Sequence, residues 1–202
     1  MERTQNIVTT VQKCVYRFEG SVNKLVMDDK GSTLICIWGM PPYAHHDDPT
    51  LAVLTALMMR RELDRGCNCW CNIGIATGVV FSGVVGTSGG RKEYSVLGDT
   101  ANLAARIMAW NKFKKIQENG FIHVDEATKK AAEGDIAFQF RENFRFKGKS
   151  VNLPVFYPVD PEQEMKAYLT STHEGVRVFG KLKRERELLK LRTNPFLADN
   201  TG

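Results

Sequence analysis

Residues 93–109 have the sequence EYSVLGDTANLAARIMA, and the interpretation of the whole chain starts from this stretch. Its first part predicts a short strand over residues 94–97 that ends at Gly98. Asp99 or Thr100 is then expected to cap a helix. Helical spacing gives this helix an apolar stripe made of Leu103, Ala104, Ile107 and Met108.

Asn102 and Arg106 are four positions apart, so they lie on one helix face, one turn from each other. An amide and a planar guanidinium in this arrangement suit a nucleoside triphosphate. The amide can bond a sugar oxygen, and the guanidinium can take up charge on phosphoryl oxygens. For an isolated pair of this kind, a solvated surface helix is the commoner explanation. A nucleotide site is therefore favoured only if neighbouring motifs support it.

The composition indicates one globular domain with a tail, because 202 residues with 43% apolar and 25% charged residues can bury a core. The net charge of +5 is not gathered in one patch and does not identify a nucleic-acid binder. An RNA-binding ferredoxin-like domain would need stacking aromatic residues in its strands, and the sequence has no such runs. No apolar run approaches the ~20 residues of a membrane span, and the polar start is not a secretory signal.

The chain has five cysteines, an odd number. Cys67, Cys69 and Cys71 are expected to alternate along a strand and to point to one face. No histidine or paired CxxC completes a zinc set, so the sequence favours buried free thiols in a reducing, cytoplasmic compartment.

Helices of ten or more residues interleave with strands, some joined as hairpins. This pattern predicts an α+β fold with a sheet covered by helices. Gly20 is expected to end the first helix, and Asp125 to cap a short one. The helices are expected over residues 3–19, from 47 or 48 to 65, and 125–132, and the strands over 22–27, 32–38, 69–76, 79–85, 121–124, 138–146 and 151–157.

The run GDTANLAAR at residues 98–106 resembles the signature of class III adenylyl and guanylyl cyclases. Residues 20–39 and 74–86 resemble other motifs of that family in the same order, and the similarity is greatest to the second (C2-type) catalytic homology domain of bicarbonate-responsive soluble adenylyl cyclases. The resemblance implies a ferredoxin-like β-α-β-β-α-β sheet, rich in antiparallel pairs, whose first strand is missing from this chain. It places a cyclase domain at residues 1–160, and a linker or tail at 161–202 that is either a free amphipathic helix or the entry to an ATPase module.

In this family two homologous domains pair head to tail, and the resemblance implies a role for each matching residue. Lys24 and Ser95 occupy the adenine-reading positions, Asn102 would orient the ribose, and Arg106 would stabilise the transition state. A lysine ammonium only donates hydrogen bonds, which suits adenine N1 and favours ATP over GTP. The partner domain would hold two Mg²⁺ or Mn²⁺ ions through two aspartates.

Asp28 lies four positions after Lys24, where the metal-binding half carries one of those aspartates, but a hairpin turn is the favoured explanation for it. The resemblance implies the ATP-reading half of an adenylyl cyclase, inactive alone, which makes cyclic AMP and pyrophosphate with a metal-bearing partner. The alternative is a catalytically inactive cyclase-homology domain that acts as a regulatory or scaffolding module. The thiols and the lack of a targeting segment predict a cytoplasmic location, and kinship with soluble cyclases adds the axoneme of a cilium or flagellum as a candidate location.

Overall fold

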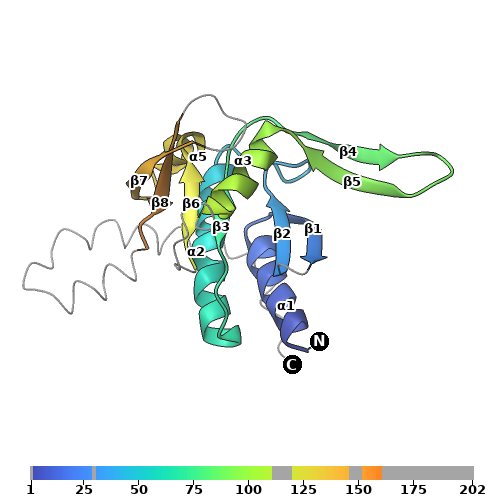
Figure 1. Cartoon of the computed structure of the whole chain (residues 1–202), viewed down its shortest axis with the longest axis horizontal. Coiled ribbons are helices and arrows are strands. Elements are labelled where there is room, and N and C mark those ends of the chain that lie inside the picture. Colours follow the sequence, from blue (N-terminus) through green and yellow to red (C-terminus); the bar gives the residue numbers. More distant parts are fainter. Residues whose placement is uncertain (1, 29–30, 111–119, 146–151, 161–202) are drawn as a thin grey trace, which may run out of the picture.

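The computed structural model describes residues 2–28, 31–110, 120–145 and 152–160. The expected tail at 161–202 lies outside the described residues, so the domain boundary at 160 stays a prediction. Two long helices, α1 (Glu2–Arg17) and α2 (Asp48–Cys67), lie side by side (Figure 1). Their predicted positions are confirmed within two residues at every end. Within the described residues, no helix is long and apolar enough to cross a membrane.

The main sheet has four strands in the order β3-β6-β8-β7. The strands are β3 (Ile73–Ile75), β6 (Ile122–Asp125), β7 (Phe138–Phe144) and β8 (Leu153–Pro158). The β3–β6 pair is parallel, whereas β6–β8 and β7–β8 are antiparallel. The strands predicted over residues 138–146 and 151–157 are therefore confirmed as β7 and β8, which form a hairpin.

Helices cover both faces of this sheet. On one face, α2 and α5 (Glu126–Ala132) pack against Ile122 and Val124 in the larger core cluster. On the other face, Ile107 of α3 (Asp99–Met108) packs against Val155 of β8. Because successive side chains of a strand point to opposite faces, Val124 and the residues next to it in β6 lie on opposite faces of the sheet. The predicted α+β class, rich in antiparallel pairs, is confirmed.

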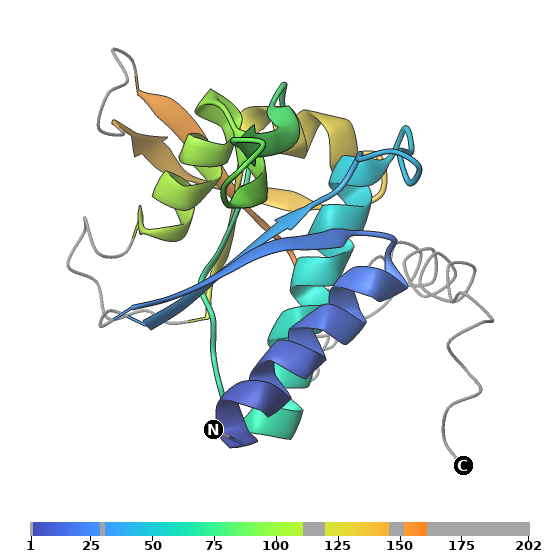
Figure 2. The ribbon, with the colours of Figure 1, turned by 90° about the vertical axis from the view of Figure 1, so that its right-hand side faces the viewer.

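Two hairpins stand apart from the main sheet and form sheets of their own. The first pairs β1 (Ser21–Asp28) with β2 (Gly31–Ile37), and the second pairs β4 (Phe81–Gly86) with β5 (Lys92–Leu97). Figure 2 shows the β1–β2 hairpin crossing the two long helices, onto which Val22 and Leu34 pack. The β4–β5 hairpin projects from the body as a long arm (Figure 1).

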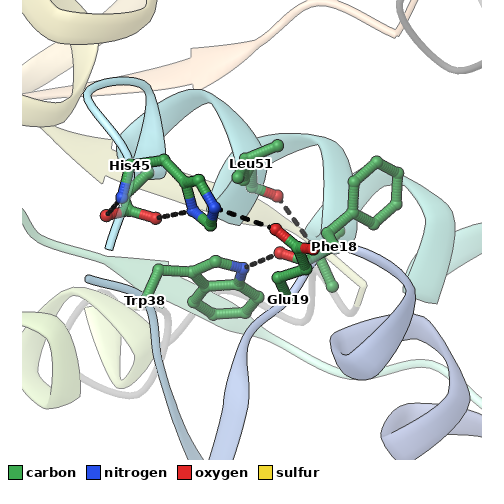
Figure 3. Close-up of polar contacts among 7 residues, drawn as sticks. Phe18, Glu19, Trp38, His45 and Leu51 are labelled. Carbon is green, nitrogen blue, oxygen red and sulfur yellow. Dashed lines mark hydrogen bonds and ion pairs between the residues drawn. The ribbon is translucent and has the colours of Figure 1, made fainter. Parts of the chain in front are cut away.

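Gly20 follows α1, but its role differs from the prediction. Glu19 takes the left-handed conformation, with φ at 56°, and the Gly20 N–H donates to Val15 O at 3.0 Å, as in a Schellman ending. A Cβ on Gly20 would lie 2.5 Å from the Trp38 ring. Trp38 is fixed there because its Nε1–H donates to Phe18 O at 3.0 Å (Figure 3). A glycine is therefore required for close approach of the ring, not for left-handed backbone.

His45 joins the end of α1 to the start of α2. Its Nε2 lies 2.9 Å from a Glu19 carboxylate oxygen, and its backbone N–H donates to Asp48 at 2.8 Å (Figure 3). His45 itself lies on the segment between β2 and α2. The two long helices are thus held together at this end by polar contacts as well as by apolar packing.

The prediction that three alternating cysteines share a strand is wrong. α2 continues to Cys67 and ends at Asn68, which has φ at 44° and whose N–H bonds to Leu63 O. Cys69 and Cys71 lie between that cap and β3. The left-handed Asn68 turns the chain back along the helix, and the sequence pattern did not distinguish this connection from a strand.

The five cysteines are free thiols, and Cys14 is buried as predicted, whereas the other four are only half-buried. Burial raises the pKa of Cys14 and of Cys71 to about 11 and that of Cys36 to about 12. These thiols therefore stay protonated at neutral pH and behave as small apolar groups in the packing of α1 and α2.

Candidate functional site

Lys24 and β5 are brought together by the fold, although they are far apart in sequence. The Lys24 ammonium lies 2.6 Å from the Glu93 carboxylate, a contact between residues 69 positions apart. Beside it, the side-chain amide of Asn23 donates to Tyr94 O at 3.2 Å. These two contacts fix β1 against β5 at the position of Ser95.

Ser95 lies on the same face of β5 as Glu93, because side chains two positions apart in a strand share a face. Its strand partner on β4 is Gly83, and its side chain is half-buried. The structure therefore places Lys24 and Ser95, the two predicted base-reading residues, within one small region at the β1–β5 contact.

Glu93 is a member of this site that the sequence reasoning missed. Its hydrogen bond and charge interaction with Lys24 lower the pKa of the Glu93 carboxyl below its usual value, so it is ionised at neutral pH. Both side chains are partly exposed, at 45% for Lys24 and 35% for Glu93. The available signal was period-two alternation, which puts Glu93 beside Ser95.

The helix that follows β5 begins at Gly98, whose φ is 148°. The predicted side-chain cap by Asp99 or Thr100 is wrong, since Gly98 is the N-cap and no side chain caps it. The Thr100 hydroxyl donates instead to Val79 O at 3.1 Å, which ties the helix to the segment before β4.

Asn102 and Arg106 share one face of α3, as their spacing predicted. Asn102 is exposed and Arg106 is half-buried, whereas Ile107 is fully buried against β8. Within the described part of the chain, neither the amide of Asn102 nor the guanidinium of Arg106 has a recorded side-chain partner. Both groups are thus available to a ligand.

The depth of α3 on the sheet is set by Gly74. A Cβ on this residue would lie within 3.0 Å of the α3 backbone at Ala104 and Met108. The absence of a side chain allows β3 and α3 to approach backbone to backbone. The two predicted pairs of site residues lie on β1–β5 and on α3, which directly follows β5, and no recorded contact within the described ranges joins one pair to the other.

Asp28 is the last residue of β1, opposite Gly31, and its side chain lies outside the described atoms. Its assignment to a metal site therefore stays a prediction. Among the residues that the structure describes, no group of three or more His, Cys, Asp or Glu could hold a metal ion.

Comparisons with known proteins place these features in a family context. The family described as the adenylate and guanylate cyclase catalytic domain matches residues 4–171. Adenylate cyclase type 10 of Homo sapiens is 36% identical over 108 residues, which are 51% of this chain and 6% of that protein. The protein of the same name from Rattus norvegicus is 35% identical over 108 residues, with the same coverage. The match thus spans only a small part of these relatives.

Solved cyclase structures share the fold. The adenylyl cyclase CyaB from P. aeruginosa aligns with a TM-score of 0.66 and 21% identity, over 79% of this chain and 81% of that one. The guanylate cyclase domain of RhGC from Catenaria anguillulae, in complex with GTP, aligns with a TM-score of 0.60 and 19% identity, over 77% and 81% of the two chains. At these identities the likeness concerns the fold alone.

Proposed function

The chain belongs to the family of adenylate and guanylate cyclase catalytic domains, and we propose that it is the ATP-binding half of an adenylyl cyclase. The observation that carries this proposal is the contact that holds Lys24 against β5, 2.6 Å from Glu93 and beside Ser95. This contact brings a donor, Lys24, and an acceptor, Glu93, together on the strand that leads into the helix carrying Asn102 and Arg106. ATP would be converted to cyclic AMP and pyrophosphate.

Base recognition is assigned to the β1–β5 region. The Lys24 ammonium has three donors, and the bond to Glu93 uses one of them, which leaves donors for adenine N1. The Ser95 hydroxyl would accept a bond from the adenine amino group. Glu93 could accept a further bond from an amino group of the base, so a direct comparison of ATP with GTP tests this assignment.

The chemistry is assigned to α3. Cyclisation is an attack of the ribose 3′-oxygen on the α-phosphorus, in which a new P–O bond forms and the bond to pyrophosphate breaks. Asn102 would hold the ribose in position for this attack. The Arg106 guanidinium, which has no recorded partner among the described residues, would stabilise negative charge on the phosphoryl oxygens.

Divalent metal ions, Mg²⁺ or Mn²⁺, are proposed to be held by a partner domain. Among the described residues no group of three or more His, Cys, Asp or Glu could hold a metal ion, and the resemblance gives the two metal-binding aspartates to the partner. Metal ions in such a site would lower the pKa of the attacking hydroxyl and neutralise phosphate charge. The metal ligands are accordingly assigned to the partner, and the described residues of this chain to the nucleotide.

A second cyclase-homology domain is proposed as the partner. Large apolar side chains are exposed on the projecting β4–β5 hairpin and on the β1–β2 hairpin, and an apolar surface of this kind is typical of an interaction face. The exposed residues are Leu25, Val26, Met27, Ile35, Phe81, Val84, Val85, Tyr94 and Leu97. The resemblance to soluble cyclases also supports a following ATPase module and a cytoplasmic or ciliary location, which imaging of the tagged protein would test.

The decisive experiment measures cyclic AMP formation from ATP, with Mg²⁺ and then Mn²⁺, by the full natural polypeptide that contains this segment. Arg106→Ala should lower turnover at least about a hundredfold, since it removes charge stabilisation from the transition state. Arg145→Ala is the matched control, because Arg145 is exposed just beyond β7. Circular dichroism would establish that each variant is folded.

Either result is informative. Loss of activity in Arg106→Ala alone would support the assignment, and equal turnover of the two variants would refute it. No activity with either metal in a folded protein would favour the regulatory or scaffolding alternative. A preference for GTP over ATP would overturn only the base assignment.

A further inference from the structure

Glu93 holds the lysine that is assigned to base recognition. Lys24 Nζ lies 2.6 Å from Glu93 Oε1. The other carboxylate oxygen, Oε2, accepts a bond from Arg91 Nη2 at 3.5 Å. Both oxygens of this carboxylate therefore face cations, and one of those cations is the proposed reader of the adenine ring.

The Lys24 side chain needs such an anchor because it is 45% exposed. A lysine carries its ammonium on a flexible four-carbon stem that samples many rotamers in solvent. An ammonium that is free to move loses this freedom when it binds a base, and the loss weakens binding. A lysine that is already held in place before the nucleotide arrives avoids most of that loss.

The backbone around Glu93 is positioned independently of this ion pair. The side-chain amide of Asn23 donates to Tyr94 O at 3.2 Å, and Glu93 pairs with Val85 in the antiparallel ladder of β4 and β5. Removal of the carboxylate therefore leaves β1 in contact with β5. Ion pairs between exposed side chains contribute little to folding stability, so a substitution of Glu93 should leave the domain folded.

We propose that Glu93 is a positioning residue, which holds the Lys24 ammonium as a fixed donor for adenine N1 and thereby sets the preference for ATP. This inference rests on the proposed function and deepens it, since it names the residue on which base recognition by Lys24 depends. Both Glu93 oxygens already accept bonds from cations, which favours a role through Lys24 over direct contact with the base. Guanine carries a hydrogen on N1, so a fixed ammonium opposes it.

The test measures nucleotide Kd by isothermal titration calorimetry, on the full natural polypeptide that contains this segment and with Mg²⁺ present. The probe is the α,β-methylene analogue of ATP, which cannot release pyrophosphate and is not consumed. Glu93→Gln keeps the size of the side chain and removes its charge, and it should raise the Kd about fivefold or more. Glu126→Gln is the matched control and should leave the Kd unchanged, because it breaks an exposed glutamate–lysine pair of the same kind on α5.

Two further measurements separate positioning from direct contact with the base. In the Lys24→Ala background, Glu93→Gln should change the Kd less than about twofold, since no ammonium is left to position. The matching analogue with an unsubstituted purine has N1 but no amino group, and Glu93→Gln should weaken its binding as much as that of the adenine compound. The matching GTP analogue should bind Glu93→Gln no more weakly than the natural chain, so the preference for ATP narrows.

If the natural polypeptide does not bind the ATP analogue, the proposed function fails and this inference fails with it. If the natural chain binds the analogue and Glu93→Gln binds it equally well, only the role of Glu93 is overturned. A loss that persists without Lys24, or that is confined to the purine with an amino group, would mean that Glu93 contacts the base directly and would overturn the positioning role. An equal loss in Glu126→Gln would overturn it as a general charge effect.

Discussion

Acidification should destabilise this domain through one buried histidine. His123 lies between Phe121 and Trp110, 2% exposed. Burial, then the charge of Arg141, lowers its pKa from 6.5 to about 4, against a smaller opposite effect of Glu142. The perturbation is a change of pH from 7.5 to 5.0, applied to the natural chain and to His123→Gln, which cannot titrate.

The direction follows from proton linkage. Between pH 6.5 and 4 the unfolded histidine binds a proton and the folded one does not, so lower pH favours unfolding. The stability that the domain gains from a neutral His123 is fully present above pH 6.5 and is lost as the pH falls towards 4. For these pKa values the free energy of unfolding should drop by about 2 kcal/mol between pH 7.5 and 5.0 because of His123 alone.

Urea denaturation at the two pH values measures this difference within each variant, so an overall loss of stability in His123→Gln does not affect the comparison. The matched control is His46→Gln, because His46 is exposed. The natural chain and the control should lose about 2 kcal/mol more than His123→Gln on acidification. An equal loss in all three would refute the reasoning that burial keeps His123 neutral.

Three further predictions concern stability and can be read by thermal or urea denaturation. Gly20→Ala should lower the free energy of unfolding by about 1–3 kcal/mol, because the added Cβ would lie 2.5 Å from the Trp38 ring. Gly66→Ala should raise it by up to about 1 kcal/mol, because Gly66 lies in α2 and a Cβ there would have no atom within 4 Å. Equal effects at the two glycines would contradict this. Asp125→Ala should cost about 1–2 kcal/mol, since the carboxylate caps α5; a change below about 0.3 kcal/mol would argue against the cap. Asp160→Asn should cost about 3–5 kcal/mol by leaving two arginines without their anion, and an unaffected midpoint would show that other groups replace it.

Local patterns in the sequence predicted much of the fold. Helical spacing of apolar residues located α1 and α2, and runs typical of strands located the strands of the β1–β2 and β7–β8 hairpins. The cap at Asp125 was also predicted, and its side chain accepts the Thr128 N–H. In each case the information lies within a few residues, where propensity and side-chain period act directly.

Long-range geometry could not be predicted in the same way. The Lys24–Glu93 pair joins strands 69 positions apart, and no local rule specifies that contact. Gly20 takes part in the ending of α1, as predicted, but a glycine is needed there because the Trp38 ring approaches it closely. The segment after Cys67 has strand-like alternation but follows a left-handed cap. Each of these features depends on what the rest of the fold places beside it.

The position of the proposed catalytic helix is therefore a property of the core as much as of its own sequence. Arg106 lies on α3 between Ala104 and Met108, whose backbone is in direct contact with Gly74 of β3. On the buried side, Ile107 fixes the rotation of the helix against Val155. A side chain at Gly74 would force α3 away from the sheet and carry Arg106 with it, even though Gly74 has no group that could touch a nucleotide. Because transition-state stabilisation depends on placement to within about 0.5 Å, a residue without chemistry of its own constrains the chemistry of this site.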